Sequence, residues 1–160
     1  MLVVADSSPL IVLINIEYIE ILPTLFGQVV IPHEVSAELE QSNRPQPVRT
    51  FISSPPPWLF RQTPSTVEPI PMLHPGEAAA ISLALELHAD LLLIDEVLGR
   101  KAAAARSIRF TGTIGILERA ADKGLLDLKD AFDRIKGTDF WISDELLDAR
   151  LRLYLERQKR

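Results

Sequence analysis

Two carboxylates flank a helix and a strand near the middle of the chain. Glu77 lies in the first turn of a predicted helix that Pro75 and Gly76 open. Asp95 directly follows the apolar run at residues 91–94, which predicts a strand buried on both faces of a parallel sheet. In a right-handed βαβ unit, the start of the helix and the end of the next strand meet at one edge of the sheet, where open α/β sheets bind ligands. Neighbouring carboxylates repel unless a cation or a proton lies between them, so the pair predicts a site that binds one.

Each of these two acids also has a purely structural interpretation. Glu77 would favour the positive end of its helix, and Asp95 would begin a turn or cap the helix that follows. The pair alone leaves both interpretations open. Further acids at the same edge would favour a functional site.

Two more acids occupy comparable positions earlier in the chain. Asp6 follows a predicted buried strand at residues 2–5 and precedes a Ser-Ser-Pro helix start. Glu38 lies in a predicted helix within two turns of the end of the strand at residues 28–31. Four consecutive αβ elements therefore each carry one carboxylate toward the same edge.

Four hard oxygen ligands around an open site suit Mg²⁺ or Mn²⁺, which keep several waters and bridge to phosphate oxygens. The implied reaction is metal-assisted hydrolysis of a phosphodiester by water, in which the carboxylates hold the metal and one accepts a proton. The chain has no cysteine, no Gly-x-Ser-x-Gly elbow and no glycine-rich phosphate loop with its lysine. The three histidines, His33, His74 and His88, lack close ligand spacing, so a histidine-bound zinc site is not expected.

The composition of the 160 residues predicts one domain of ordinary size, with 47% hydrophobic residues for its core. The net charge of -5 argues against a protein that coats nucleic acid by bulk electrostatics, but it does not exclude an enzyme that acts on nucleic acid. The absence of cysteine suits a cytoplasmic protein. No segment reaches the length of a membrane span, so no membrane association is expected.

A proline-rich segment at about residues 43–75 contains nine of the twelve prolines. Neither half of the chain beside it is large enough for a complete α/β unit, so we interpret it as a surface excursion and not as a linker. The excursion is expected to contain a short helix near residues 48–51 and an edge strand at 58–60. It offers a surface for a partner or a substrate.

The C-terminal part is predicted to contain a last strand at residues 108–110 and then helices at 114–123 and 127–136. The turn Thr111-Gly112-Thr113 would present hydroxyl and N–H groups at the active edge, or would simply cap a helix. Ser143 is expected to cap a terminal helix whose apolar face packs on the domain or forms an oligomer contact.

Several motifs together resemble the PIN-domain family, in the branch of prokaryotic proteins related to VapC-type toxins. They are residues 2–10 (Leu-Val-Val-Ala-Asp-Ser-Ser-Pro-Leu), 31–39 (Ile-Pro-His-Glu-Val-Ser-Ala-Glu-Leu), 76–81 (Gly-Glu-Ala-Ala-Ala-Ile), 92–96 (Leu-Leu-Ile-Asp-Glu), 111–115 (Thr-Gly-Thr-Ile-Gly) and 141–146 (Trp-Ile-Ser-Asp-Glu-Leu). The resemblance covers nearly the whole chain.

The resemblance implies a three-layer α/β/α sandwich with a central, mainly parallel sheet and a C-terminal helix, formed as one domain over residues 1–160. It also implies an endoribonuclease that depends on Mg²⁺ or Mn²⁺. The residues that match the family's catalytic and metal-binding acids are Asp6, Glu38, Glu77 and Asp95. Ser8 matches a hydroxyl or amide residue of the family, and Ser8, Arg100 and Thr113 are predicted to bind the substrate.

Two positions depart from the family pattern. Glu77 stands where better-known toxins often carry aspartate, and Thr113 stands where some members carry a further acid. A glutamate reaches farther and still ligates, whereas a missing acid would weaken metal binding or leave one ion instead of two. The resemblance also implies a homodimer and a small antitoxin protein whose tail enters the acidic groove.

Two other classes of function fit part of the pattern. A non-catalytic PIN-fold module would keep the fold and bind RNA or a protein partner without cleavage. A phosphoacceptor domain of receiver type also gathers strand-end acids around Mg²⁺, but it needs a lysine at a late strand end. Phe110-Thr111-Gly112 stands at that place here.

Overall fold

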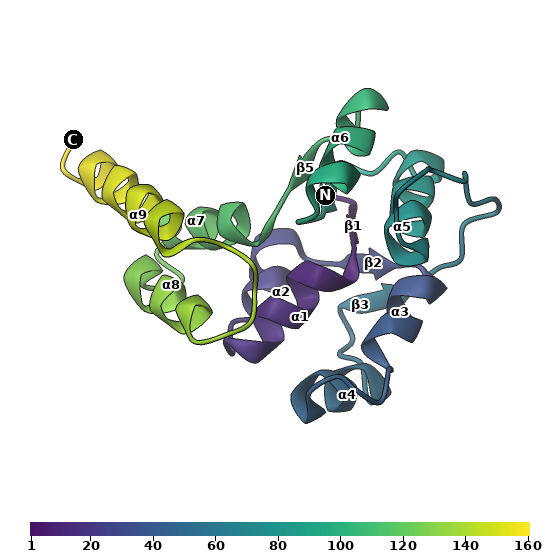
Figure 1. Cartoon of the computed structure of the whole chain (residues 1–160), viewed down its shortest axis with the longest axis horizontal. Coiled ribbons are helices and arrows are strands. Elements are labelled where there is room, and N and C mark those ends of the chain that lie inside the picture. Colours follow the sequence, from purple (N-terminus) through teal and green to yellow (C-terminus); the bar gives the residue numbers. More distant parts are fainter. The chain divides into compact units, whose positions relative to one another are not determined.

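The computed structural model describes residues 1–160, which form two compact units. The sheet unit comprises Met1–Thr113 and the helical unit comprises Ile114–Arg160. Figure 1 labels the elements of both units along the chain.

The sheet unit is built on five parallel strands in the order β3-β2-β1-β4-β5. The strands are β1 (Val3–Ala5), β2 (Val29–Ile31), β3 (Leu59–Arg61), β4 (Leu91–Leu93) and β5 (Phe110–Thr111). The three inner strands are uninterrupted apolar runs that are wholly buried, as expected for a parallel sheet covered on both faces. The sequence-based prediction of this sheet is confirmed.

Helices cover the sheet in two layers. They are α1 (Ser7–Asn15), α2 (Ile21–Phe26), α3 (His33–Leu39), α4 (Gln46–Ser53), α5 (Pro75–Glu86) and α6 (Val97–Ala105). The chain moves from β1 to β3 in one direction and then crosses back to β4, so right-handed connections place α5 and α6 on the face opposite to α1, α3 and α4. In agreement, α5 packs against α6, β1 and β4, whereas α1 packs against α3 and α4. The predicted three-layer α/β/α architecture is therefore present.

The core beneath α5 fixes the position of this helix. Alternate residues of the strands face it, including Val4, Val30 and Leu92, and they meet Ile81 and Leu83 of α5. Nine consecutive residues of α5, from Gly76 to Ala84, are buried. A helix buried on nearly all sides has little freedom to turn, so its first residues are held at the carboxyl edge of the sheet.

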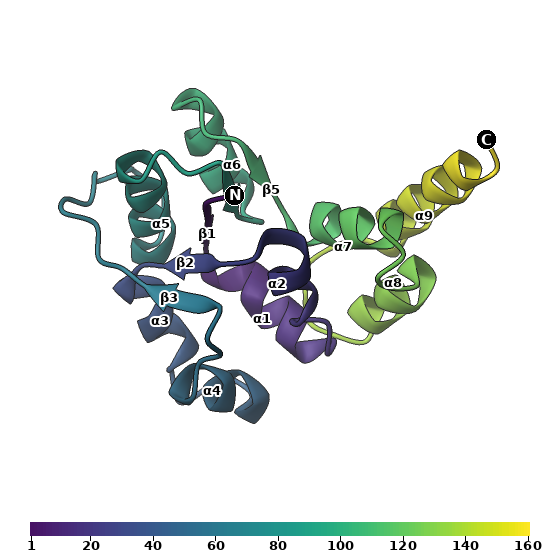
Figure 2. The same ribbon diagram turned by 180° about the vertical axis from the view of Figure 1, so that it is seen from behind.

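The proline-rich excursion contains the helix α4 and the edge strand β3, as predicted. Figure 2 shows β3 beside β2 with α4 on the same side of the unit as α3. The remainder of the excursion is tied to α5, because the Ser65 N–H donates to Glu86 Oε1 at 3.0 Å and the Glu68 N–H donates to Ser82 Oγ at 3.0 Å. Glu68 also pairs with Arg106 at 2.7 Å. The predicted strand and helix boundaries differ from the observed ones by one or two residues; the last strand, for example, comprises residues 110–111 and not 108–110.

The helical unit contains the helices that follow the sheet. α7 (Thr113–Asp122) begins at the last residue of the sheet unit and is followed by α8 (Leu128–Lys136) and α9 (Asp144–Gln158). Ser143 caps α9 as predicted, with its hydroxyl accepting the Leu146 N–H at 3.1 Å. No helix of the chain has the length and apolar character needed to cross a lipid bilayer.

A bidentate ion pair joins α7 to α9. Arg150 donates to both carboxylate oxygens of Glu118, at 3.0 and 2.5 Å, and Glu118 is buried while Arg150 is partly exposed. The Tyr154 hydroxyl adds a hydrogen bond to the Ala121 carbonyl at 3.2 Å. Paired charges of this kind resist disruption because removal of one partner leaves the other buried and unpaired.

Replacement of Arg150 by alanine is therefore expected to lower the free energy of unfolding by about 1–3 kcal/mol, since Glu118 loses its two charged donors. Urea denaturation followed by circular dichroism measures this. Lys129→Ala is the control, because its pair with Asp133 is exposed and screened by solvent, so its loss should leave the stability nearly unchanged. Equal losses in both variants would contradict the structural role of the Glu118–Arg150 pair.

Candidate active site

The strand order places Asp6 and Asp95 where the sheet changes direction. β1 lies between β2 and β4, so the crevice beyond β1 and β4 is the topological switch point at which open α/β sheets bind ligands. Asp6 directly follows β1, and its N–H donates to the carbonyl of Leu93, the last residue of β4, at 2.9 Å. The hydroxyl of Ser8, the second residue of α1, donates to Asp95 Oδ2 at 3.1 Å. The two strand ends are thereby joined through their acidic residues.

Asp95 is held by donors on both carboxylate oxygens. The Thr113 N–H donates to Oδ1 at 2.7 Å and the Thr113 hydroxyl donates to Oδ2 at 2.8 Å. Thr113 is fully buried, so both of its polar groups serve to position Asp95. Asp95 is not a helix cap, because α6 begins at Val97 with Glu96 in the N-cap position.

Asp6 carries an unpaired carboxylate oxygen in the protein interior. It occupies the N-cap position of α1, but its side chain makes no capping hydrogen bond. The residue is 3% exposed, and its Oδ1 atom is buried without a hydrogen-bond partner. Buried polar atoms of folded proteins are nearly always paired, so this oxygen calls for a proton or a cation.

Glu38 and Glu77 each use one oxygen for a local hydrogen bond. Glu38 Oε2 accepts a short hydrogen bond from the Ser7 hydroxyl, which directly follows Asp6. Glu77 Oε1 accepts the His74 N–H at 3.0 Å and so closes the N-terminus of α5. Its Oε2 is buried and unpaired. The structural and the functional interpretations of Glu77 therefore apply to different oxygens of the same side chain.

The four acids share one electrostatic environment. Burial, opposed by the Ser7 N–H and reinforced by the charges of Glu38, Glu77 and Asp95, raises the pKa of Asp6 to about 8. Burial also raises the pKa of Glu77, although the His74 N–H opposes this shift. The pKa of Asp95 is raised by burial too, and the hydrogen bonds from Thr113 and Ser8 and the charge of Arg100 counteract it.

The donor set fits a hard divalent cation in its chemistry. All four side chains offer carboxylate oxygens, and two of these oxygens, on Asp6 and Glu77, are buried and unpaired. No three acidic or histidine side chains converge on a single point, however, and Glu38, Glu77 and Asp95 each accept local hydrogen bonds. Binding of one ion by three of them requires rotation of at least one side chain.

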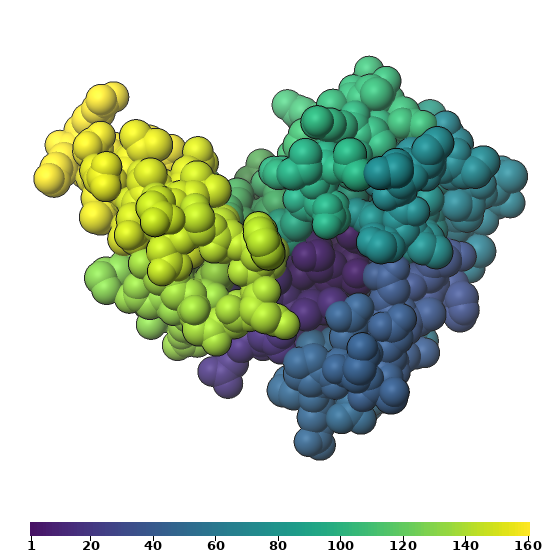
Figure 3. Space-filling view, viewed as in Figure 1, coloured from purple at the N-terminus to yellow at the C-terminus, as the bar shows by residue number.

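The predicted substrate-binding residues lie around Asp95. Ser8 and Thr113 donate to it, and half-buried Arg100 on α6 acts on its charge. The N-terminal segment, purple in Figure 3, lies recessed between the blue segment of α3 and α4 and the teal segment of α5 and α6.

Sequence reasoning missed the residues that fix the acids. Ser7 belongs to a motif that we interpreted as a helix cap, although its hydroxyl donates to Glu38. Gly76 was interpreted only as part of a helix start, although the Glu38 carboxylate lies against it. The signal available for Gly76 was its position inside a buried helix, where glycine costs stability and usually has a packing reason.

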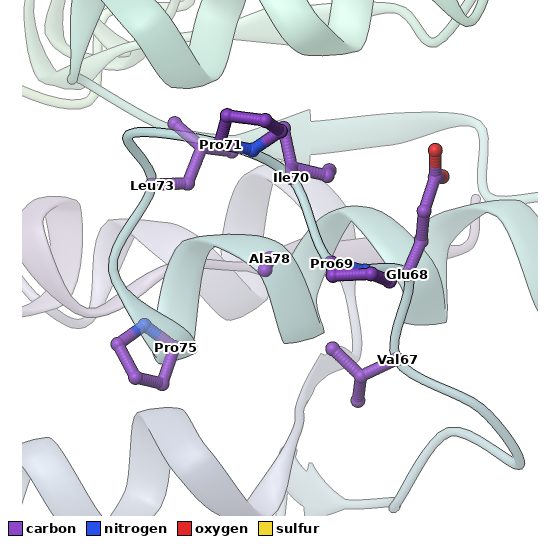
Figure 4. Close-up of a pocket in the computed structure, with 8 residues that line it drawn as sticks. All are labelled: Val67, Glu68, Pro69, Ile70, Pro71, Leu73, Pro75 and Ala78. Atoms are coloured by element: carbon purple, nitrogen blue, oxygen red, sulfur yellow. The ribbon is translucent and has the colours of Figure 1, made fainter.

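A separate pocket lies in the excursion. It has a volume of about 450 Å³. Its lining is mainly apolar and comprises Val67, Glu68, Pro69, Ile70, Pro71, Leu73, Pro75 and Ala78. Figure 4 shows that the segment before α5 forms this pocket by running alongside the helix. None of the four site acids lines it, and its mainly apolar lining suits an apolar group.

The family model DUF3368, described as a PIN domain, matches residues 2–156. The chain belongs to the PIN-domain family. PIN domains are generally nucleases and typically use divalent metals, so the chain has a nuclease-like fold, and its family suggests a nucleic-acid substrate. No curated protein and no solved structure matches the chain significantly. The strand order also differs from the 2-1-3-4-5 order of receiver domains, which excludes the phosphoacceptor interpretation.

The raised pKa of Asp6 predicts that the metal-free protein loses stability as the pH rises from about 4 to about 8. In this range the folded protein retains a proton that the unfolded chain releases, so the stabilisation is complete below the unfolded pKa of 3.8 and is lost toward pH 8. Asp6→Asn removes this titration, and at pH 8 the variant should exceed the wild type in stability by on the order of a few kcal/mol.

Thermal melting of both proteins in a chelating buffer at several pH values measures the difference. Asp139→Asn, at an exposed position, is the control and should follow the wild type. Parallel pH profiles for the wild type and Asp6→Asn would contradict the burial of the Asp6 carboxyl group.

Proposed function

We propose that the protein is a metal-dependent endoribonuclease of the PIN type, related to VapC toxins. The observation that carries this proposal is the unpaired, buried carboxylate oxygen of Asp6 beside Asp95 at the switch point of a PIN-domain sheet. A purely structural role would leave Asp6 with a hydrogen-bonded partner.

The proposed catalytic and metal-binding residues are Asp6, Glu38, Glu77 and Asp95, with Mg²⁺ or Mn²⁺ as the cation. When bound, such a cation polarises the phosphodiester and lowers the pKa of an attacking water. Asp95 contributes a fixed carboxylate because its hydrogen bonds restrict its rotation. Glu77 contributes Oε2 while its other oxygen keeps the end of α5 in place.

The substrate is proposed to be RNA. Burial raises the pKa of Asp95 and the charge of Arg100 opposes this rise, so the Arg100 guanidinium is close enough to the acids to bind a phosphate that reaches them. The positive charge of Arg100 offsets part of the repulsion between the four carboxylates and the phosphates of a polyanion.

A small antitoxin protein and a homodimer are proposed as partners on the basis of the resemblance to VapC-type toxins. Apolar residues exposed on the helical unit support a protein contact there. Trp141 is 96% exposed, and Leu146, Leu153 and Leu155 on α9 are each about half exposed. A cytoplasmic location for the domain formed by residues 1–160 completes the proposal.

One observation favours a second candidate, a PIN-fold module that binds RNA or a protein without cleaving it. No three of the candidate ligands converge on one point. In such a module the acids would be structural, and the protein would bind nucleic acid with or without divalent ions.

The nuclease proposal predicts that Asp6→Asn and Asp95→Asn each lower Mn²⁺-dependent cleavage of single-stranded RNA roughly 100-fold or more, because a required carboxylate is lost. Cleavage of labelled oligonucleotides resolved on a gel measures the rates. The same sequences as DNA test the preference for RNA.

Asp139→Asn is the matched control and should cleave at the wild-type rate. Retained cleavage in both site variants would contradict the assigned site. Binding of RNA by the wild type without any cleavage in Mn²⁺ or Mg²⁺ would favour the non-catalytic module.

A further inference from the structure

The glycines of the sheet unit serve two different purposes. Gly27 has a positive φ of 80°, and a side chain there would meet no atom within 4 Å, so it is a glycine of backbone conformation. Gly76 and Gly112 have ordinary φ values, but a Cβ atom on either would meet a carboxylate of the candidate active site. These two positions require glycine because of the missing side chain and not because of the backbone.

Gly76 lies against Glu38. A Cβ atom at residue 76 would lie 2.7 Å from Glu38 Cδ and closer still to Oε1. Oε1 is the carboxylate oxygen that does not bind Ser7. This approach occurs where α3 packs against the first turn of α5, next to Glu77. The carboxylate of Glu38 therefore occupies the space that a side chain on α5 would take.

Gly112 and Gly99 show related contacts. A Cβ atom on Gly112 would lie 2.6 Å from Asp95 Oδ1, the oxygen that accepts the Thr113 N–H. At Gly99 the first contact would be with Ile94 Cδ1, and Glu77 Oε2 would follow at 3.3 Å. A side chain at Gly99 would therefore disturb mainly the packing of the core, whereas side chains at Gly76 and Gly112 would displace carboxylates of the site.

We propose that Gly76 is a positioning residue for Glu38. Because Gly76 has no side chain, the Glu38 carboxylate fits beside the start of α5, and this position sets how far the carboxylate reaches toward Asp6 and Glu77. The inference rests on the proposed metal-dependent function and assigns to this glycine the placement of one of its ligands. Gly112 has the corresponding role for Asp95.

The chain itself offers a reason to expect that the role concerns the site and not the fold. Glycine within a helix is less favourable than alanine, so Gly76 weakens the start of α5. The atoms that alanine would meet belong to the end of a flexible side chain and not to the backbone. Gly76→Ala should therefore fold, with the Glu38 carboxylate displaced.

The test is calorimetric titration of Mn²⁺ into four proteins: the wild type, Gly76→Ala, Glu38→Ala and the double variant. We expect Gly76→Ala to weaken Mn²⁺ binding about tenfold or more, in the range found when the groups that orient a metal ligand are removed. In the Glu38→Ala background the same substitution should cause no further loss, because the carboxylate that it displaces is absent. Gly137→Ala is the matched control, since its φ is also ordinary and a Cβ atom there meets only a carbonyl at 3.4 Å.

Melting temperatures of the same proteins in a chelating buffer give a readout that needs no metal. Gly76→Ala should raise the melting temperature more in the Glu38→Ala background than in the wild type, because only there does alanine enter α5 without displacing a carboxylate. Equal effects in both backgrounds, or wild-type Mn²⁺ affinity in Gly76→Ala, would overturn the proposal. A third outcome separates the two proposals. If the effect of Gly76→Ala on the melting temperature depends on Glu38 but the wild type binds no Mn²⁺, the positioning role is supported and the proposed metal-dependent function is overturned.

Discussion

The structure depends on the gathering of four carboxylates, two of them buried and two partly buried, at one edge of a parallel sheet. Parallel strands all end at the same edge, and the reversal of strand order at β1 places Asp6 and Asp95 on neighbouring strand ends. Burial and mutual repulsion make this cluster unfavourable, as the raised pKa of Asp6 shows. The hydroxyls of Ser7, Ser8 and Thr113 offset part of this cost, because they donate hydrogen bonds to the acids around Asp6.

Each acid is held in a different way, and the differences have consequences for chemistry. Asp95 has donors on both oxygens and is the most rigid of the four. Glu38 and Glu77 each use one oxygen for a local bond and keep the other beside the cluster. Asp6 makes no capping bond and keeps a buried oxygen unpaired. A cation that enters this edge would therefore find rigid and adaptable ligands together, which suits an ion whose coordination changes as a phosphate binds.

Much of the fold could be predicted from the sequence, because the buried strands are short apolar runs between clear helix starts. The meeting of Asp6 with Asp95 followed from chain topology alone, since strand ends converge whatever the side chains do. The hydrogen bond from Ser7 to Glu38 and the space left by Gly76 could not be predicted, because they depend on how α3 packs against α5. Thr113 was correctly placed near the acids, but its burial beneath Asp95 depends on a backbone turn that residue types do not specify.

Anomalous X-ray diffraction from crystals grown with Mn²⁺ tests most directly whether these acids bind a metal ion. We expect an anomalous peak at the carboxyl edge of β1 and β4, with carboxylate oxygens of both Asp6 and Asp95 among its ligands. A peak elsewhere, or a well-ordered edge without a peak at saturating Mn²⁺, would contradict the assignment of these acids to a metal site.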